Sequence, residues 1–295
     1  MSTSVLYDEP GPKALRRARI GTVVAALAIA ALLYVALSRL AEQGQFDWEL
    51  WGPWLDPSFD EFPLVWGLVG QGAVATLTAA ALAITFSLVV GVGLGMSRMM
   101  LGRVARVPIV GFIELFRGLP VIITIVFVWR AFVELDVNID LLPGKDGLWY
   151  LVIGLTLYNS VIIAEILRAG VASLPSGQRE AALAVGMTPR QAMTTVQLPQ
   201  AFRIMLPALI SQVVVILKDT SLVALLGFYL ELLARGEQVL RVLGNPIQSL
   251  FIVGTIFIAI NYALSRLATW LERRMSRDRG GVEAVEAVES VVPQT

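Results

Sequence analysis

Four consecutive polar residues interrupt an apolar stretch in the second half of this sequence. They are Lys218, Asp219, Thr220 and Ser221, and the first follows Arg203 by about 15 residues, or roughly 22 Å of helix rise. An ionisable side chain inside a bilayer costs at least ~2.5 kcal/mol, so such a residue usually faces a cavity or a partner. A solute that carries both a carboxylate and an ammonium group would find complementary charges here. The alternative is a static lock, in which Lys218 only neutralises Asp219.

Other polar side chains lie in apolar stretches at spacings that suit pairing. Glu114 and Arg117 are three residues apart, and Glu165 and Arg168 repeat that spacing. Residues three apart share one face of a helix, so each pair can form an ion pair. We favour a structural or gating role for these four charges over contact with a solute. Asn159 lies in a neighbouring apolar stretch and is a further candidate for a solute pathway.

The elements that must position these residues are membrane-spanning helices. The chain is 56% hydrophobic and only 16% charged, whereas soluble domains carry about 25% charged residues. Six stretches approach the length of about 20 apolar residues that crosses a hydrocarbon core. The expected spans are 20–38, 72–96, 108–132, 148–166, 205–228 and 250–270. The first is too long for a cleavable signal peptide. We therefore predict an all-α membrane protein with six transmembrane helices.

Basic and acidic residues alternate between the loops that join these spans. Arginines cluster before the first span, between the second and third, between the fourth and fifth, and after the sixth, while the other two loops are acidic. Because cytoplasmic loops carry an excess of Lys and Arg, both termini are predicted to be cytoplasmic. Residues 1–19 then form a cytoplasmic N-terminal tail, residues 20–65 the first span with an acidic extracellular loop, and residues 271–295 a mobile cytoplasmic C-terminal tail.

The residue types that are missing narrow the function. The chain has no Cys and no His, which removes disulfides, thiolate chemistry, and the commonest general base and transition-metal ligand. No G-x-x-x-x-G-K-[ST] motif occurs, so any ATP must be hydrolysed by a separate subunit. We expect a transport subunit that is not an enzyme and needs no cofactor, metal or nucleic acid.

An intramembrane hydrolase using Lys218 with Ser221 is one alternative. An ion-driven secondary transporter is another, although such proteins often have repeated halves and none is visible here.

A polar segment, residues 179–201, separates the fourth and fifth spans. Residues 180–185 favour a helix with a smooth alanine face, and Gly186 suits the left-handed position after a helix end. Thr188 is followed by Pro at the first helical position and Gln191 at the capping-box position. Pro199 is expected to close this second helix before the fifth span. From these residue types alone, both an ordinary structured loop and a docking surface fit.

The spacing of this segment resembles a known pattern. Glu180-Ala181-Ala182, then Gly186, then Val196 to Pro199 resembles the EAA loop of ABC importer permeases, with Val196 where that family usually has Ile. Four further stretches resemble polar amino-acid permeases: 113–120 (IELFRGLP), 163–170 (IAEILRAG, with Ala169 in place of a glycine), 173–178 (SLPSGQ) and 217–222 (LKDTSL). Residues 5–12 (VLYDEPGP) resemble the start of actinobacterial glutamate permeases.

This resemblance implies a type I ABC importer permease fold over residues 66–270 in a bacterial plasma membrane. It implies that residues 171–200 form the coupling loop that docks on a cytoplasmic ABC ATPase subunit, with Glu180, Ala181, Ala182 and Gly186 as the coupling residues. The other implied partners are a second permease subunit, identical or different, an extracytoplasmic solute-binding protein and membrane lipid. The implied substrate is a polar amino acid, with glutamate favoured and glutamine next.

Overall fold

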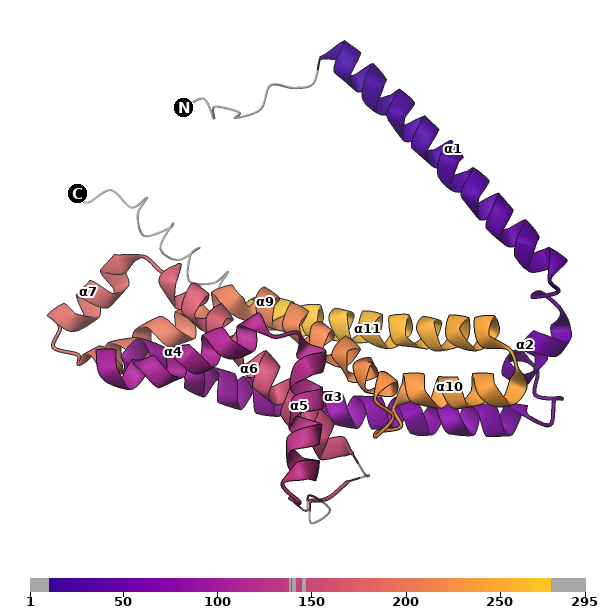
Figure 1. Cartoon of the computed structure of the whole chain (residues 1–295). Coiled ribbons are helices and arrows are strands. Elements are labelled where there is room, and N and C mark those ends of the chain that lie inside the picture. The colour runs from indigo at the N-terminus through magenta and orange to yellow at the C-terminus, as the bar shows by residue number, and fades with distance from the viewer. Residues whose placement is uncertain (1–10, 138, 140–141, 145–146, 277–295) are drawn as a thin grey trace. The chain divides into compact units, whose positions relative to one another are not determined.

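The computed structural model describes residues 11–137, 139, 142–144 and 147–276 (Figure 1). Every regular element in this part of the chain is a helix, which confirms the predicted all-α class. Contacts divide the chain into two compact units after Phe62, and each unit is described by itself. Residues 1–10 and 277–295, which include most of the expected tails, lie outside the described residues.

The first unit contains two helices. Helix α1 (Pro12–Glu42) includes the expected first span and has no buried residue within its own 31-residue length. Its apolar side chains therefore suit contact with lipid. Helix α2 (Trp48–Leu55) is short, and its Trp54 is 1% exposed. A Cβ at Gly52 would lie within 2.2 Å of the Phe59 ring, so this glycine allows the ring to close over the helix.

Long apolar helices dominate the second unit. They are α3 (Phe62–Met100), α6 (Leu148–Ala172), α9 (Leu198–Asp219) and α11 (Pro246–Ser276). Counting α1, five stretches of the described chain are long and apolar enough to cross a membrane, and a bent pair makes up to six. One core cluster joins α3, α5 and α6 with the end of α9 and the segment that follows it, and includes Ala79, Ile125, Leu155 and Ile216.

The third expected span is not one straight helix. Helices α4 (Arg103–Gly118) and α5 (Val121–Glu134) are bent by 111° relative to each other. Leu119 at the break is extended, with φ −92° and ψ 143°, and Pro120 precedes α5. A residue before proline is pushed out of the helical region, and proline offers no N–H to continue the helix. The expected span over 108–132 is therefore a bent pair of helices, and the break at Pro120 is the part that was not predicted.

The fifth span begins earlier than expected. A short helix α8 (Pro189–Gln191) continues through the π-helical segment η1 (Ala192–Gln197) into α9. The prediction that Pro199 ends the second loop helix was wrong, because Pro199 lies in the first turn of α9. The Leu198 N–H bonds to the Met193 carbonyl, five residues back. This bond spans five residues instead of the four of an α-helix, so it shifts the hydrogen-bond register just before Pro199. Pro199 has no N–H and would leave one bond unmade in a regular α-helix.

After α9 the chain forms a 3₁₀ segment and then an α-helix that was not predicted from the sequence. The 3₁₀ segment η2 (Thr220–Leu225) is followed by α10 (Leu232–Leu243). The buried Glu231 caps α10 by accepting hydrogen bonds from the N–H groups of Leu233 and Ala234 at 2.8 and 2.9 Å. The Thr76 hydroxyl donates to the same carboxylate at 3.4 Å. These bonds fix α10 against α3.

Small residues bring α3 close to α6. A Cβ at Gly91 would lie 2.7 Å from the Ser160 carbonyl oxygen, and one at Gly95 would lie 3.1 Å from the Ala164 carbonyl oxygen. Glycines at this spacing let helix backbones approach in membranes. Residues near the end of α3 are thereby held beside the last turns of α6.

Candidate functional site

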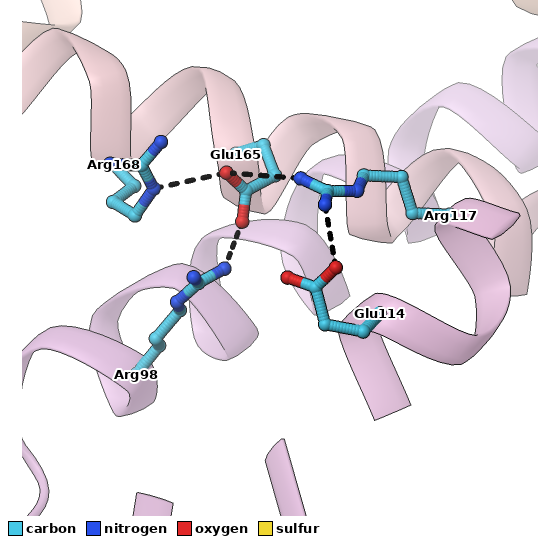
Figure 2. Close-up of polar contacts among 5 residues, drawn as sticks. All are labelled: Arg98, Glu114, Arg117, Glu165 and Arg168. Atoms are coloured by element: carbon cyan, nitrogen blue, oxygen red, sulfur yellow. Dashed lines mark hydrogen bonds and ion pairs between the residues drawn. The ribbon is translucent and has the colours of Figure 1, made fainter. Parts of the chain in front are cut away.

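Five charged residues from three helices form one cluster, and Glu165 of α6 lies at its centre (Figure 2). One Glu165 oxygen pairs with Arg98 of α3, and the other lies 3.0 Å from Arg168 Nε and 4.0 Å from an Arg117 nitrogen. Arg117 also pairs with Glu114 at 2.5 Å. The structure therefore forms both pairs expected from the i,i+3 spacing and joins them into one network.

Arg98 is the member of this network that sequence reasoning missed. It lies 67 residues from Glu165 in the chain, so helical spacing gives no sign of the contact. The Arg98 and Glu165 side chains are only 20% and 17% exposed, whereas Arg117 and Arg168 are about half exposed. The more buried pair is the one whose disruption would leave a poorly solvated charge.

The loop between α6 and α9 adopts the local structure expected from its residues. Helix α7 (Ser176–Ala184) is followed by Val185 and then by Gly186, whose φ is +86°. The Gly186 N–H bonds to the Leu183 carbonyl and the Met187 N–H to the Ala182 carbonyl, at 3.0 and 3.1 Å, which is a Schellman motif. The next helix begins with the predicted capping box between Thr188 and Gln191.

The expected coupling residues do not all lie on the surface. Glu180, Ala181 and Gly186 are exposed, but Ala182 is only 5% exposed, and α7 packs against η1. Gln200 also donates a hydrogen bond to Gln178 at 3.2 Å, which ties the start of α9 to α7. The loop is therefore a packed unit with an exposed outer edge rather than a helix with a fully exposed alanine face.

Lys218 lines a groove of about 460 Å³ between α9 and α11, two helices that lie side by side in Figure 1. The groove is lined by Val214, Lys218, Ser221, Phe257, Ile258, Asn261, Tyr262 and Ser265. Its described lining carries one cation and no acidic residue. Asn261 donates to the Phe257 carbonyl at 2.7 Å, while its Oδ1 is buried and has no hydrogen-bond partner among the described residues.

The residues predicted for a solute pathway are not all in this groove. Asn159 is fully buried, donates to the Leu155 carbonyl at 2.8 Å and accepts from Gln212 at 2.6 Å. Thr220 is also fully buried and donates to the Leu217 carbonyl at 2.7 Å. Asp219 is half-buried, and the described structure contains no ion pair between it and Lys218.

Asn261 and Tyr262 are groove residues that sequence reasoning overlooked. With Ser265 they form a polar patch of positions i, i+1 and i+4 within an otherwise apolar span. Polar residues within a span usually face a cavity or a partner. The same argument that singled out Lys218 would therefore have found them.

Most of this chain is similar to known membrane proteins. Residues 87–277 match the protein family described as "Binding-protein-dependent transport system inner membrane component". The "Glutamate transport system permease protein GluD" of Corynebacterium glutamicum is 38% identical over 250 residues, which cover 84% of this chain and 88% of that protein. The "Glutamine transport system permease protein GlnP" of Escherichia coli is 31% identical over 233 residues, covering 78% and 98%. The "Arginine transport system permease protein ArgU" of C. glutamicum is 29% identical over 263 residues, covering 86% and 80%.

Solved structures show the same fold. A chain of an amino acid ABC transporter, crystallised with histidines, is 27% identical with a TM-score of 0.64, and the match covers 74% of this chain and 99% of that chain. A chain of the MetNI methionine ABC transporter is 20% identical with a TM-score of 0.61, covering 72% and 97%.

Proposed function

This chain belongs to the binding-protein-dependent ABC transporter permeases, and from that membership we propose that it carries glutamate across the plasma membrane. It is the multi-pass membrane subunit of an importer for polar amino acids and lacks an ATPase domain. Permeases of this family work with ATPase subunits and a solute-binding protein. The observation that carries the choice of glutamate is the 38% identity to a glutamate permease over 84% of the chain.

The chemistry of the Lys218 groove supports an acidic or neutral amino acid over a basic one. The Lys218 ammonium can bind a substrate carboxylate, and the described lining has no acidic side chain to neutralise it. Asn261 lines the same groove and contributes an uncharged amide side chain to it. Arginine would instead place its guanidinium near a lysine without a compensating carboxylate. We assign the groove residues Lys218 and Ser221 to the substrate pathway, with Asn261 added to them.

The loop between α6 and α9 is proposed to dock on the ATPase subunit. Glu180, Ala181 and Gly186 provide its exposed edge, and buried Ala182 holds α7 against η1. In this proposal the loop, residues 171–200, lies in the cytoplasm together with both termini, which the excess of arginines in these segments supports. Two such loops are needed for two ATPase subunits, so we propose that this chain pairs with a second permease, either a copy of itself or a related chain.

The charge cluster around Glu165 is proposed to close the bundle next to this loop. It connects α3 and α4 to the last two to three turns of α6, the helix that leads into the loop, and two of its arginines remain partly exposed. A structural or gating role therefore suits Glu114, Arg117, Glu165 and Arg168 better than contact with a substrate.

Reconstituted transport tests the proposal. The permease, its ATPase subunit and its solute-binding protein would be placed in proteoliposomes, and uptake of labelled L-glutamate would be followed with and without ATP. We expect ATP-dependent uptake in which excess unlabelled glutamate competes best, glutamine competes less well and arginine competes least. ATP-dependent uptake that arginine inhibits best would contradict glutamate as the substrate but not the permease role.

A further inference from the structure

A cavity of about 1220 Å³ lies between the end of α3, the end of α6 and the loop formed by α7, α8 and η1. Three arginines from three different elements line it: Arg168 from α6, Arg179 from α7 and Arg190 from α8. The described lining contains no acidic residue. A cavity of this size with three converging cations favours an anionic ligand.

Two of these arginines are available to bind such a ligand. Arg168 pairs with Glu165 at 3.0 Å. The side chains of Arg179 and Arg190 are exposed and form no hydrogen bond or ion pair with the described part of the chain. Guanidinium groups bind phosphate oxygens through parallel hydrogen bonds, which makes a phosphate group a well-matched ligand.

The other side of the cavity is apolar and adaptable. Four methionines line it: Met96, Met99 and Met100 from α3, and Met193 from η1, and Leu101 and Val171 add branched side chains. Methionine side chains are flexible and fit irregular apolar ligands. A cavity with cations on one side and methionines on the other suits an amphipathic ligand better than a free ion.

The cavity lies at the level where the membrane surface is expected. A Cβ at Gly95 would lie 3.0 Å from Leu167, so α3 packs beside the last two turns of α6 near its own C-terminal end. Helix α6 has 25 residues, or roughly 37 Å of helix, and a hydrocarbon core is about 30 Å thick. Its final residues, from Arg168 onward, therefore reach the interface. Basic pockets between helices on the cytoplasmic side bind anionic lipid headgroups.

We propose that this cavity binds an anionic phospholipid, with its phosphate between Arg179 and Arg190 and an acyl chain along the methionines. The lipid would connect the coupling loop to the ends of α3 and α6 and so stabilise the loop. The cytoplasmic position of the cavity rests on the orientation given under the proposed function, but the chemistry of its lining does not.

Native mass spectrometry of the purified complex tests this proposal. Short-chain phosphatidylglycerol, short-chain phosphatidylcholine and inorganic phosphate would be added separately, and bound ligands would be counted on the permease chain. We expect phosphatidylglycerol to be retained and to raise the unfolding temperature, and the other two ligands to do neither. The double variant Arg179→Gln, Arg190→Gln should lower phosphatidylglycerol retention at least about tenfold.

Two matched variants separate the site from general charge and from folding. Arg103→Gln with Arg106→Gln removes two exposed arginines of α4 that do not line the cavity, and should leave lipid retention unchanged. Gly93 lines the cavity, and a Cβ there would meet nothing within 4 Å. Gly93→Leu should therefore block the acyl side without strain and lower retention. Gly67→Leu, at the opposite end of α3 and equally open, is its control.

Several results would overturn the proposal. Equal retention in the Arg179, Arg190 double variant and the wild type would exclude these arginines as ligands. Equal stabilisation by inorganic phosphate would indicate a free-anion site instead of a lipid site. Greater lipid retention after deletion of the acidic residues 280–295 would show that this tail occupies the cavity. ATPase co-purification and glutamate uptake, measured on the same preparations, show whether the proposed function itself stands.

Discussion

Arg98 at the end of α3 forms an ion pair with Glu165 in α6, across a helix contact that glycines make close. This contact joins two local pairs into a five-residue network. Without Glu165, three arginines would lose the carboxylate that they share. Without Arg98, Glu165 would keep only the partly exposed Arg168 and the more distant Arg117.

Glu165→Gln should destabilise the protein. We expect a loss of about 2–3 kcal/mol in the free energy of unfolding, near the lower limit for a buried pair because both side chains keep some exposure. The measurement is thermal unfolding of the purified complex, together with its membrane abundance. Glu134→Gln, which breaks the exposed pair with Arg130, is the control and should change little. Equal effects of the two substitutions would show that the Glu165 network does not hold the bundle.

Gly186→Val should uncouple transport from ATP hydrolysis. Gly186 has φ +86°, a conformation that costs an ordinary residue roughly 1–2 kcal/mol and a β-branched residue more. A Cβ there would meet nothing within 4 Å, so the effect acts through the backbone alone. We expect normal membrane insertion, weak co-purification of the ATPase subunit and loss of uptake.

The control is Gly177→Val, at an equally open glycine of α7 that has no positive φ, and this variant should keep uptake. Wild-type uptake by Gly186→Val would reject the docking role of this turn.

Lys218→Met should lower glutamate uptake without lowering abundance. Methionine keeps much of the apolar stem and removes the ammonium, so the loss should be roughly tenfold or more, as for a charge-assisted hydrogen bond. Uptake per folded complex and membrane abundance are the two measurements. Because the described structure shows no ion pair between Lys218 and Asp219, abundance should not depend on their pairing. If abundance fell with Lys218→Met and both abundance and uptake returned with Lys218→Met, Asp219→Leu, the pair would be a structural lock instead.

The stability of wild-type protein should fall as pH rises through neutrality, because of Glu231. This residue lies between the last two candidate spans, and burial raises the pKa of its carboxyl from the ordinary 4.5 to about 7. Between those values the folded protein keeps a proton that the unfolded chain has lost. The contribution of Glu231 to the free energy of unfolding is therefore fully present below about pH 4.5 and is lost as the pH rises through about 7. The charged and titratable groups nearby are Tyr229, Arg235 and Glu237.

Glu231→Gln isolates this contribution, since its amide oxygen can still cap α10. The measurement is the unfolding temperature of wild type and variant from pH 4.5 to 8. We expect the difference between the two to change across this range. Parallel curves would show that Glu231 is not the titrating group.

Reporter fusions check the orientation that the charge distribution predicts. A reporter fused after Arg279 should be cytoplasmic, and one inserted near Asp140 should be extracellular. External labelling of the C-terminal reporter would reverse the topology and remove the cytoplasmic setting of the coupling loop.

Local features of this protein follow from the sequence because neighbouring residues create them. The capping box at Thr188, the left-handed turn at Gly186 and the pair of Glu114 with Arg117 depend on spacings of three or four residues. The number and order of the candidate spans depend on runs of apolar residues and were also predicted, whereas the ends of the helices were not. The bend at Pro120 was a local signal as well, but the apolar run hid it.

Only the tertiary structure decides which faces of different helices meet. The rotation of α6 buries Asn159 against Gln212, so a residue that looked available to a solute is fully bonded. The close contact at Gly91 and Gly95 brings Arg98 to Glu165, and the packing of α11 on α9 places Asn261 beside Lys218. The helical period fixes the direction of a side chain relative to its own helix. It says nothing about the partner that packing will put there, and that is why the groove and the charge network emerged only in three dimensions.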